Sequence, residues 1–190
     1  MGITMETLAK MICVSPGESS RALLIIGTVG AGKTSVADMV GDLLADAGVA
    51  HAVIDVDALR RSWPPAPDDR FNFEMALRNL RSVAGNYLDA GAVRLVMAGV
   101  AETREDRRRY AEAVGIELTV CRLRVELPVV RRRLARRHQG EEAALQWHLK
   151  RSGELDQIME NAQLEDVVVE ASDGSVPEVA EAVMKAIGWI

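Results

Sequence analysis

The stretch Gly27-Thr28-Val29-Gly30-Ala31-Gly32-Lys33-Thr34 decides the fold. Several backbone N–H groups must converge on one point to hold a phosphate, and glycine permits that geometry. A lysine directly after the last glycine reaches the β- and γ-oxygens of a nucleoside triphosphate, and the next hydroxyl contacts Mg²⁺. The sequence therefore predicts a phosphate-binding loop (P-loop) for MgATP, with GTP left open. The residues assigned to the nucleotide here are Gly27, Gly30, Ala31, Gly32, Lys33, Thr34 and Ser35.

The sequence on either side of the loop supplies the context that the loop needs. The apolar run 22–26 ends at the glycines, as a buried strand does, and residues 34–47 have the apolar spacing of a helix. The N-terminus of that helix is expected to point at the bound anion. A chance glycine turn next to a lysine would not have this strand and this helix.

The rest of the chain also alternates between strands and helices. Four further strands are expected at 49–56, 93–98, 116–125 and 167–170. Further helices are expected at 73–88, 103–114, 128–137, 141–161 with a break near Ser152-Gly153, and 176–187 with a capping box formed by Ser175 and Glu178. Because parallel strands need crossover connections, this alternation predicts an α/β fold: a three-layer P-loop NTPase fold, in which a five-stranded parallel sheet has helices on both faces.

Length and composition narrow the class of protein. At 190 residues the chain suits one domain at 21–190, preceded by an appendage at 1–20 with a short helix around 6–13. The net charge of −5 argues against a nucleic-acid partner, and the two cysteines lack the spacing of metal ligands. No signal peptide and no apolar run of roughly 20 residues is present, so we expect no membrane partner and a cytoplasmic location.

A pair of acids follows the second expected strand, at the carboxyl edge where ligands bind in open α/β sheets. Alternation along the strand is expected to point Asp55 and Asp57 to the same side. We assign Asp57 as the base that accepts a hydroxyl proton and Asp55, with Thr34, to the metal. Arg60 is assigned to an anionic substrate or to the transferring phosphate. The alternative is a helix start, with Asp57 as N-cap and Arg60 in solvent.

Some motifs of other phosphate-binding proteins are missing. The third expected strand ends at Gly99 without an acid, and the chain has neither Asn-Lys-x-Asp nor the Asp-x-x-Gly of GTPase switches. A motor ATPase or a GTPase would normally show one of these features. A small kinase that takes its acid from the second strand would not.

An arginine-rich helix follows the fourth expected strand. Arg133 and Arg137 are four residues apart and share a helix face, so we assign them to the transferring phosphoryl group. The intervening and preceding arginines are expected to be solvated. Residues at about 138–156 are then expected to form a helical lid. Trp63 and residues 71–73 flank a proline-rich loop near the acids and are candidates to wall a substrate pocket, although core packing explains them almost as well.

Taken together, these residues resemble the small P-loop kinases of the nucleotide-kinase-like group, which include adenylylsulfate, gluconate and shikimate kinases, chloramphenicol phosphotransferases, zeta toxins and polynucleotide kinases. The resemblance covers about residues 21–189. It implies the sheet order 2-3-1-4-5, a base after the second strand and arginines in the lid. It also implies that the loop 172–174 lies near adenine, so Asp173 is assigned to the nucleotide.

The closest local match is adenylylsulfate kinase, whose Asp-Gly-Asp-Asn-x-Arg aligns with residues 55–60. Val56 and Ala58 depart from that pattern, and residues 72–79 keep little of the family's Asp-Arg-x-x-Asn-Ile-Arg-Arg. Arg78 stands in that segment and is assigned, with Arg60 and Trp63, to the substrate. The resemblance therefore implies shared catalytic machinery with a different acceptor.

Two classes of function remain in view. The leading hypothesis is an ATP-dependent kinase that transfers the γ-phosphate to a hydroxyl of a small molecule, with ATP and Mg²⁺ as cofactors. The alternatives are a regulatory nucleotide-binding ATPase without an acceptor, and a nucleotide or polynucleotide 5′-kinase. The identity of the acceptor is open, and a homodimer is compatible with the sequence.

Overall fold

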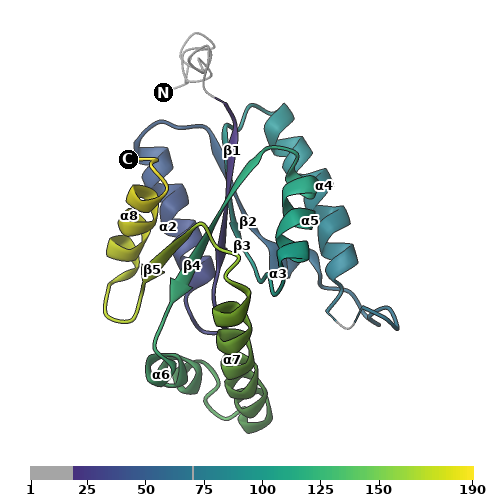
Figure 1. Ribbon diagram of the computed structural model, residues 1–190, viewed down its shortest axis with the longest axis vertical. Helices are drawn as coiled ribbons and strands as arrows, with labels where there is room; N and C mark the ends of the chain where they lie inside the picture. The colour runs from purple at the N-terminus through teal and green to yellow at the C-terminus, as the bar shows by residue number, and fades with distance from the viewer. Residues whose placement is uncertain (1–18, 70) are drawn as a thin grey trace, which may run out of the picture.

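The strand that precedes the P-loop is buried along almost its whole length. β1 (Arg21–Ile26) has five fully apolar residues after its first, as expected of a central strand covered on both faces. In the computed structural model, which describes residues 19–69 and 71–190, this strand lies at the centre of one parallel sheet. The sheet order is β2–β3–β1–β4–β5, which confirms the order implied by the resemblance (Figure 1). The other strands are β2 (His51–Asp55), β3 (Arg94–Ala98), β4 (Glu117–Arg124) and β5 (Val167–Glu170).

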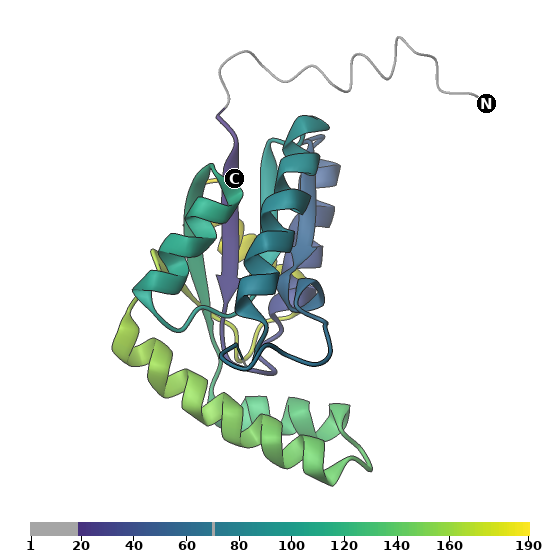
Figure 2. The same cartoon turned by 90° about the vertical axis from the view of Figure 1, so that its right-hand side faces the viewer.

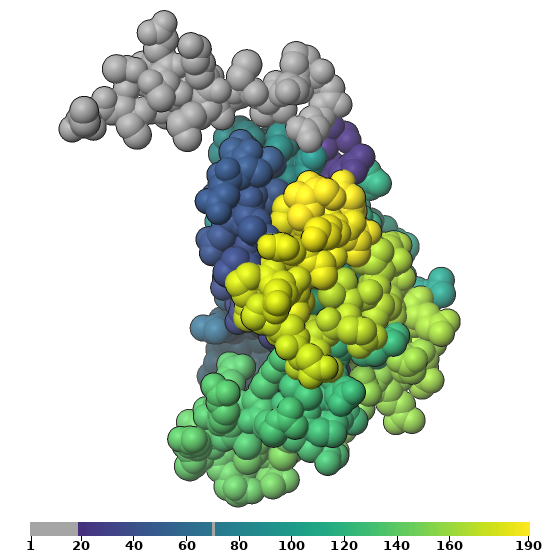
Figure 3. Space-filling view, turned by 90° about the vertical axis from the view of Figure 1, so that its left-hand side faces the viewer, coloured from purple at the N-terminus to yellow at the C-terminus, as the bar shows by residue number. Residues whose placement is uncertain are grey.

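Helices cover both faces of the sheet, which confirms the three-layer α/β fold. α2 and α8 lie side by side on one face, and α4 and α5 lie on the other (Figures 1 and 3). The helices within the described residues are α2 (Lys33–Asp46), α3 (Val56–Leu59), α4 (Phe73–Asp89), α5 (Arg104–Val114), α6 (Leu127–Arg137), α7 (Glu142–Ala162) and α8 (Val176–Ala186). None of them is both long enough and apolar enough to cross a membrane. The helix expected around 6–13 lies outside the described residues.

Alternation along β1 builds one core on each side of the sheet. Leu23 and Ile25 pack on the side of α2 and α8, whereas Leu24 and Ile26 pack on the side of α4 and α5. α8 begins with the expected capping box, in which the Ser175 backbone N–H donates to the Glu178 carboxylate.

Two local predictions were wrong. β2 ends at Asp55, and α3 begins at Val56 because the Asp55 side chain accepts a hydrogen bond from the Asp57 N–H and so caps a helix. The alternation expected for Asp55 and Asp57 therefore does not apply. α7 also runs without a break through Ser152-Gly153. Ser152 is buried there, and its hydroxyl donates to Leu149 O within the same helix.

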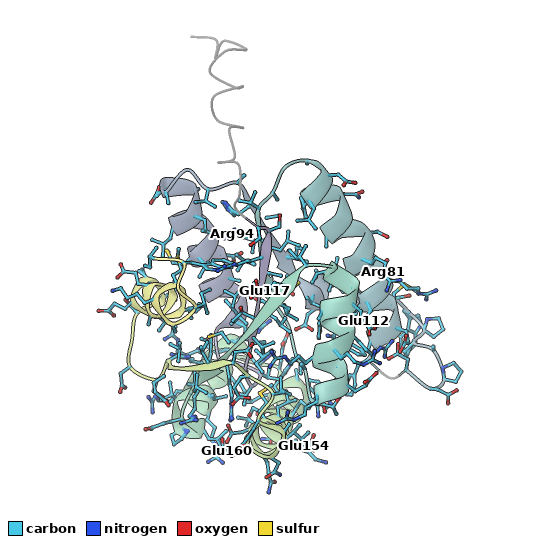
Figure 4. All side chains as sticks on the ribbon, turned by 45° about the horizontal axis from the view of Figure 1, so that its top comes forward. Arg81, Arg94, Glu112, Glu117, Glu154 and Glu160 are labelled. Carbon is cyan, nitrogen blue, oxygen red and sulfur yellow. The ribbon has the colours of Figure 1, made fainter. Side chains whose placement is uncertain are left out.

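α6 and α7 pack against each other across the carboxyl end of the sheet, as the two green helices at the foot of Figure 2 show. The C-terminal half of α7 is tied to β4 through Arg122, whose side chain is only 3% exposed. Arg122 forms ion pairs with Asp156 at 3.3 Å and Glu160 at 2.9 Å; Figure 4 shows Glu160 on this part of the molecule. The segment expected to form the lid, residues 138–156, thus lies mostly in α7. Together with the arginine helix α6, α7 stands over the edge where the strands end.

Candidate active site

The strand ends bring the predicted site residues to one edge of the sheet. Asp55 at the end of β2 pairs in register with Ala98 of β3, and Ala98 pairs with Ile25 of β1. The loops that follow these strands therefore start side by side. Ligands bind in this position in open parallel sheets.

The P-loop has the backbone that its glycines were expected to provide. Gly30 and Gly32 have φ angles of 83° and 93°, in the left-handed region that favours glycine. A Cβ atom on Gly27 would lie 2.9 Å from the carbonyl oxygen of Leu123, so no larger residue fits there. Gly32 is the N-cap of α2, and no side chain caps this helix and no acid occupies its first turn. The free N–H groups of α2 are thus left for an anion.

Lys33 is half-buried beside the two acids. Its Nζ donates to Thr28 O at 3.1 Å. Burial lowers the pKa of Lys33, while the carboxylates of Asp57 and Asp55 act in the opposite direction. A triphosphate bound at this point would add negative charge around the ammonium group and offset the loss of water.

Asp55 and Thr34 form a pair of oxygen ligands suited to Mg²⁺. The Thr34 hydroxyl donates to Asp55 Oδ2 at 3.3 Å. Mg²⁺ is usually held by one or two protein oxygens together with substrate phosphates and water, and this pair fits that pattern. Within the described part of the chain no group of three or more His, Cys, Asp or Glu side chains forms a metal cage. The phosphates are thus expected to complete the coordination.

Asp57 and Arg60 form an ion pair, with Arg60 Nε 3.2 Å from Asp57 Oδ1. The alternative assignment of Asp57 as N-cap was wrong, because Asp55 has that position. Arg60 is not solvated either: its side chain is 19% exposed, whereas that of Asp57 is 53% exposed. The Nε and Nη2 atoms of Arg60 are buried and make no hydrogen bond among the described residues.

Two adjoining cavities meet at Asp57. The phosphate cavity, of about 350 Å³, contains Lys33, Thr34 and Asp55. The acceptor cavity, of about 690 Å³, extends from Asp57 toward α4, α5 and α7. The residues that line both are Val29, Asp57, Val100 and Arg137.

Arg133 and Arg137, the two arginines of α6 assigned to the phosphoryl group, have different surroundings. Arg133 donates to Ala31 O at 3.2 Å and to Ala171 O at 3.0 Å, so it joins the P-loop to the end of β5. Arg137 lines both the phosphate and the acceptor cavities. The two side chains share a helix face, as predicted, but only Arg137 reaches the point where the cavities meet.

A third cavity, of about 220 Å³, lies where the resemblance places adenine. It is bounded by Ser35 from the P-loop helix and by Gly174, Val176 and Val179 from the start of α8. Asp173 does not line it, although its neighbour Gly174 does. The two valines were missed because apolar residues in a first helical turn look like ordinary core positions.

Trp63 and Arg78 are not brought to any of these cavities. The side chain of Trp63 is 89% exposed, and Arg78 lies on the exposed face of α4. Their places in the wall are taken by Phe71, Phe73 and Trp147. The acceptor cavity also has polar residues that the sequence did not single out, namely Glu102 and Thr103 from the β3–α5 loop and Asp106 from the first turn of α5. The position of Glu102 and Thr103 after β3 at the carboxyl edge was the available signal. Trp147, His148 and Arg151, which belong to the segment expected to form the lid, line the cavity as well.

The comparison with family models agrees with this geometry. The model of the adenylylsulphate kinase family matches residues 19–170, which is most of the chain. The chain belongs to the adenylylsulphate kinase family. Among curated protein sequences no match was found.

Several solved structures resemble this adenylylsulphate kinase family member. The APS kinase of Mycobacterium tuberculosis, solved in complex with AMPPNP and APS, is 22% identical with a TM-score of 0.62, covering 90% of this chain and 98% of that chain. The tunicamycin resistance protein of Deinococcus radiodurans is 20% identical with a TM-score of 0.61, covering 89% and 96%. A gluconokinase from Sinorhizobium meliloti is 20% identical with a TM-score of 0.55, covering 90% and 93%. At sequence identities of 20–22%, these structural similarities establish that the proteins share a fold.

Proposed function

We propose that this protein is a kinase that transfers the γ-phosphate of MgATP to a hydroxyl group of a small molecule. The observation that carries the proposal is the position of Asp57, which lines both the phosphate cavity and the larger acceptor cavity. A carboxylate between a nucleotide site and a second site is placed to accept a proton from an attacking hydroxyl. The structural relatives support this direction, since they include an APS kinase and a gluconokinase.

Each residue has a distinct task in this transfer. The P-loop amides and Lys33 hold the β- and γ-phosphates, and Asp57 orients the acceptor hydroxyl and receives its proton. The acceptor oxygen bonds to the γ-phosphorus while the bond from that phosphorus to the β,γ-bridging oxygen breaks, and ADP leaves with the electron pair. Arg137 lies at the meeting point and stabilises the charge on the phosphoryl oxygens. Mg²⁺ bound at Thr34 and Asp55 would neutralise charge on the β- and γ-phosphates.

The acceptor cavity also separates this proposal from its alternatives. A regulatory ATPase needs no second cavity beside the γ-phosphate, whereas this one is as large as sites that hold small molecules. A polynucleotide 5′-kinase would need a basic path for the phosphate backbone. The described residues that line the acceptor cavity instead include five acids and three arginines.

The test measures phosphoryl transfer from radiolabelled ATP to each member of a library of hydroxyl compounds. The same assay is then repeated with the Asp57→Asn variant. We expect the variant to lose at least about 100-fold in kcat with any acceptor found, because removal of a general base typically costs 10²–10⁴-fold. Binding of a fluorescent ATP analogue should change less than about twofold. Equal loss of transfer and of ATP binding would refute the role of Asp57 as base. ATP binding without transfer to any compound would refute the proposal as a whole.

A further inference from the structure

The charged residues that line the acceptor cavity indicate which charge the acceptor carries. Three arginines line the cavity, and two of them each pair with a carboxylate. Arg60 pairs with Asp57 at 3.2 Å, although its buried Nε and Nη2 make no hydrogen bond among the described residues. Arg151 donates to the Glu102 carboxylate and lies over the ring of Phe71, with 5.1 Å from its guanidinium carbon to the ring centre.

The third arginine belongs to the phosphate end of the cavity. Arg137 lines the phosphate cavity as well, and its charge contributes to lowering the pKa of Lys33, so the two cations face the same region. The phosphates of a bound nucleotide would pair with the positive charge of Arg137. Each arginine among the described lining residues thus either pairs with a carboxylate or lies toward the nucleotide.

Acids remain in excess along the same wall. The carboxylates of Asp69 and Asp106 accept hydrogen bonds from backbone N–H groups at the starts of α4 and α5. Asp68 has no hydrogen bond or ion pair within residues 19–69 and 71–190. A second anion in this cavity would lie near these carboxylates and near the triphosphate, so like-charge repulsion opposes it.

The outer part of the cavity is aromatic. Phe71 and Trp147 are 39% and 45% exposed, which is unusual for side chains of this size. They line both the acceptor cavity and a smaller one of about 220 Å³ that continues outward past Lys150 and Glu154. Partly exposed aromatic rings that line a cavity suit a flat or apolar group of a ligand.

We propose that the acceptor is an uncharged or cationic hydroxyl compound whose flat or apolar part packs against Phe71 and Trp147. This inference rests on the proposed kinase function and narrows its substrate class. It sets the chain apart from adenylylsulfate as acceptor, because adenylylsulfate presents a phosphate–sulfate anhydride with negative charge on both groups.

The experiment measures kcat/KM for matched acceptors with radiolabelled ATP. Each scaffold of the library is present in a neutral, an amine and a carboxylate form, for example phenyl β-D-glucoside, phenyl 6-amino-6-deoxy-β-D-glucoside and phenyl β-D-glucuronide, with adenylylsulfate as a further anionic member. We expect product from neutral or amine forms, with kcat/KM at least about tenfold above that of the matched carboxylate. For the best acceptor, Phe71→Leu and Trp147→Leu should each raise KM about tenfold at nearly unchanged kcat, as expected for about 1.4 kcal/mol of lost contact. Tyr87→Leu is the matched control, an aromatic residue of α4 that is 42% exposed and should leave KM unchanged.

Three results would count against the inference. Higher kcat/KM for the carboxylate forms or for adenylylsulfate would overturn it and leave the kinase function standing. A KM that does not respond to Phe71→Leu or Trp147→Leu would overturn the aromatic part. ATP binding without transfer to any member of the library would refute the kinase function, and this inference with it.

Discussion

The Thr34 hydroxyl donates to Asp55 Oδ2 at 3.3 Å, so the P-loop is joined directly to the end of β2. The second oxygen of the same carboxylate accepts from the Asp57 N–H at 2.9 Å. Asp55 thus links the proposed metal ligand on one side to the proposed base on the other. One side chain has two tasks, and the two can be separated by substitution.

We predict that Asp55→Asn and Asp55→Ala share a metal defect but differ in stability. Asparagine is as good an N-cap as aspartate, so Asp55→Asn should keep the free energy of unfolding within about 0.5 kcal/mol. Alanine cannot cap α3, so Asp55→Ala should lose about 1 kcal/mol. In both variants the Mg²⁺ concentration for half-maximal turnover should rise about tenfold, because a charged ligand is lost. Urea denaturation and Mg²⁺ titration measure the two effects. An unchanged Mg²⁺ dependence would remove Asp55 from the metal site.

Arg122 and Arg124 on β4 provide a matched pair for testing how α7 is anchored. The Arg122 side chain is 3% exposed, and its ion pairs include Glu165, which is itself 10% exposed. Arg124 is 45% exposed and pairs with Glu170, which is 66% exposed. Arg122→Met should therefore destabilise the protein by about 3 kcal/mol, because it leaves a buried carboxylate without its partner. Arg124→Met should cost less than about 1 kcal/mol.

Urea denaturation of the two variants at neutral pH measures this difference. Limited proteolysis adds a local readout, since Arg122→Met should expose cleavage sites in α7 before the rest of the domain unfolds. Similar losses of stability in both variants would show that burial does not determine how much these ion pairs contribute to the free energy of unfolding.

The parts of the fold that were predicted correctly are those fixed by short stretches of sequence. The P-loop, the strand before it and the helix after it follow from glycine geometry and apolar spacing within 22–47. The capping box at Ser175 is equally local. The sheet order came from the family resemblance, because the neighbours of a parallel strand are set by crossovers that no single segment encodes.

The predictions that were wrong or incomplete also have physical causes. Asp55 ended β2 early because a short polar side chain can bond to the backbone two residues ahead, which alternation does not anticipate. Glu102 and Asp106 were missed as part of the acceptor wall because they are distant in the sequence from Phe71 and Arg151, and no spacing links these segments. Trp63 was favoured by its place in the sequence, yet nothing packs its side chain against the cavity.

Cys121 gives a test of core rigidity. It lies fully buried on β4, and burial raises the pKa of its thiol to about 12. At pH 8 only about one molecule in 10⁴ would carry the reactive thiolate. In the Cys13→Ser variant we therefore expect Ellman's reagent to label native protein only at the rate of global opening, and to label it within seconds in 6 M guanidinium chloride. Rapid labelling of the native variant would show that this side of the sheet opens locally.

Lys33 is expected to reduce stability in the absence of nucleotide. Because burial lowers its pKa below the ordinary value of 10.5, the folded protein binds this proton less tightly than the unfolded chain does. The contribution of Lys33 to stability is therefore least favourable at neutral pH and improves as pH rises from the lowered pKa toward 10.5. Lys33→Met keeps most of the apolar stem without the charge, and should raise the Tm of the nucleotide-free protein at pH 7 by about 2–4 °C.

The same substitution should reverse the order of stability when nucleotide is present. MgATP at 100 times its Kd stabilises the wild-type protein by about 2.7 kcal/mol, whereas the Lys33→Met variant should gain little because the β- and γ-phosphates lose their cation. Thermal denaturation of both proteins at pH 7 and pH 9.5, with and without MgATP, measures these differences in Tm. Without nucleotide, the Tm of the variant should exceed that of the wild-type protein by less at pH 9.5 than at pH 7. A nucleotide-free variant that melts below the wild-type protein at pH 7 would show that the bond from Lys33 Nζ to Thr28 O contributes more than the buried charge costs.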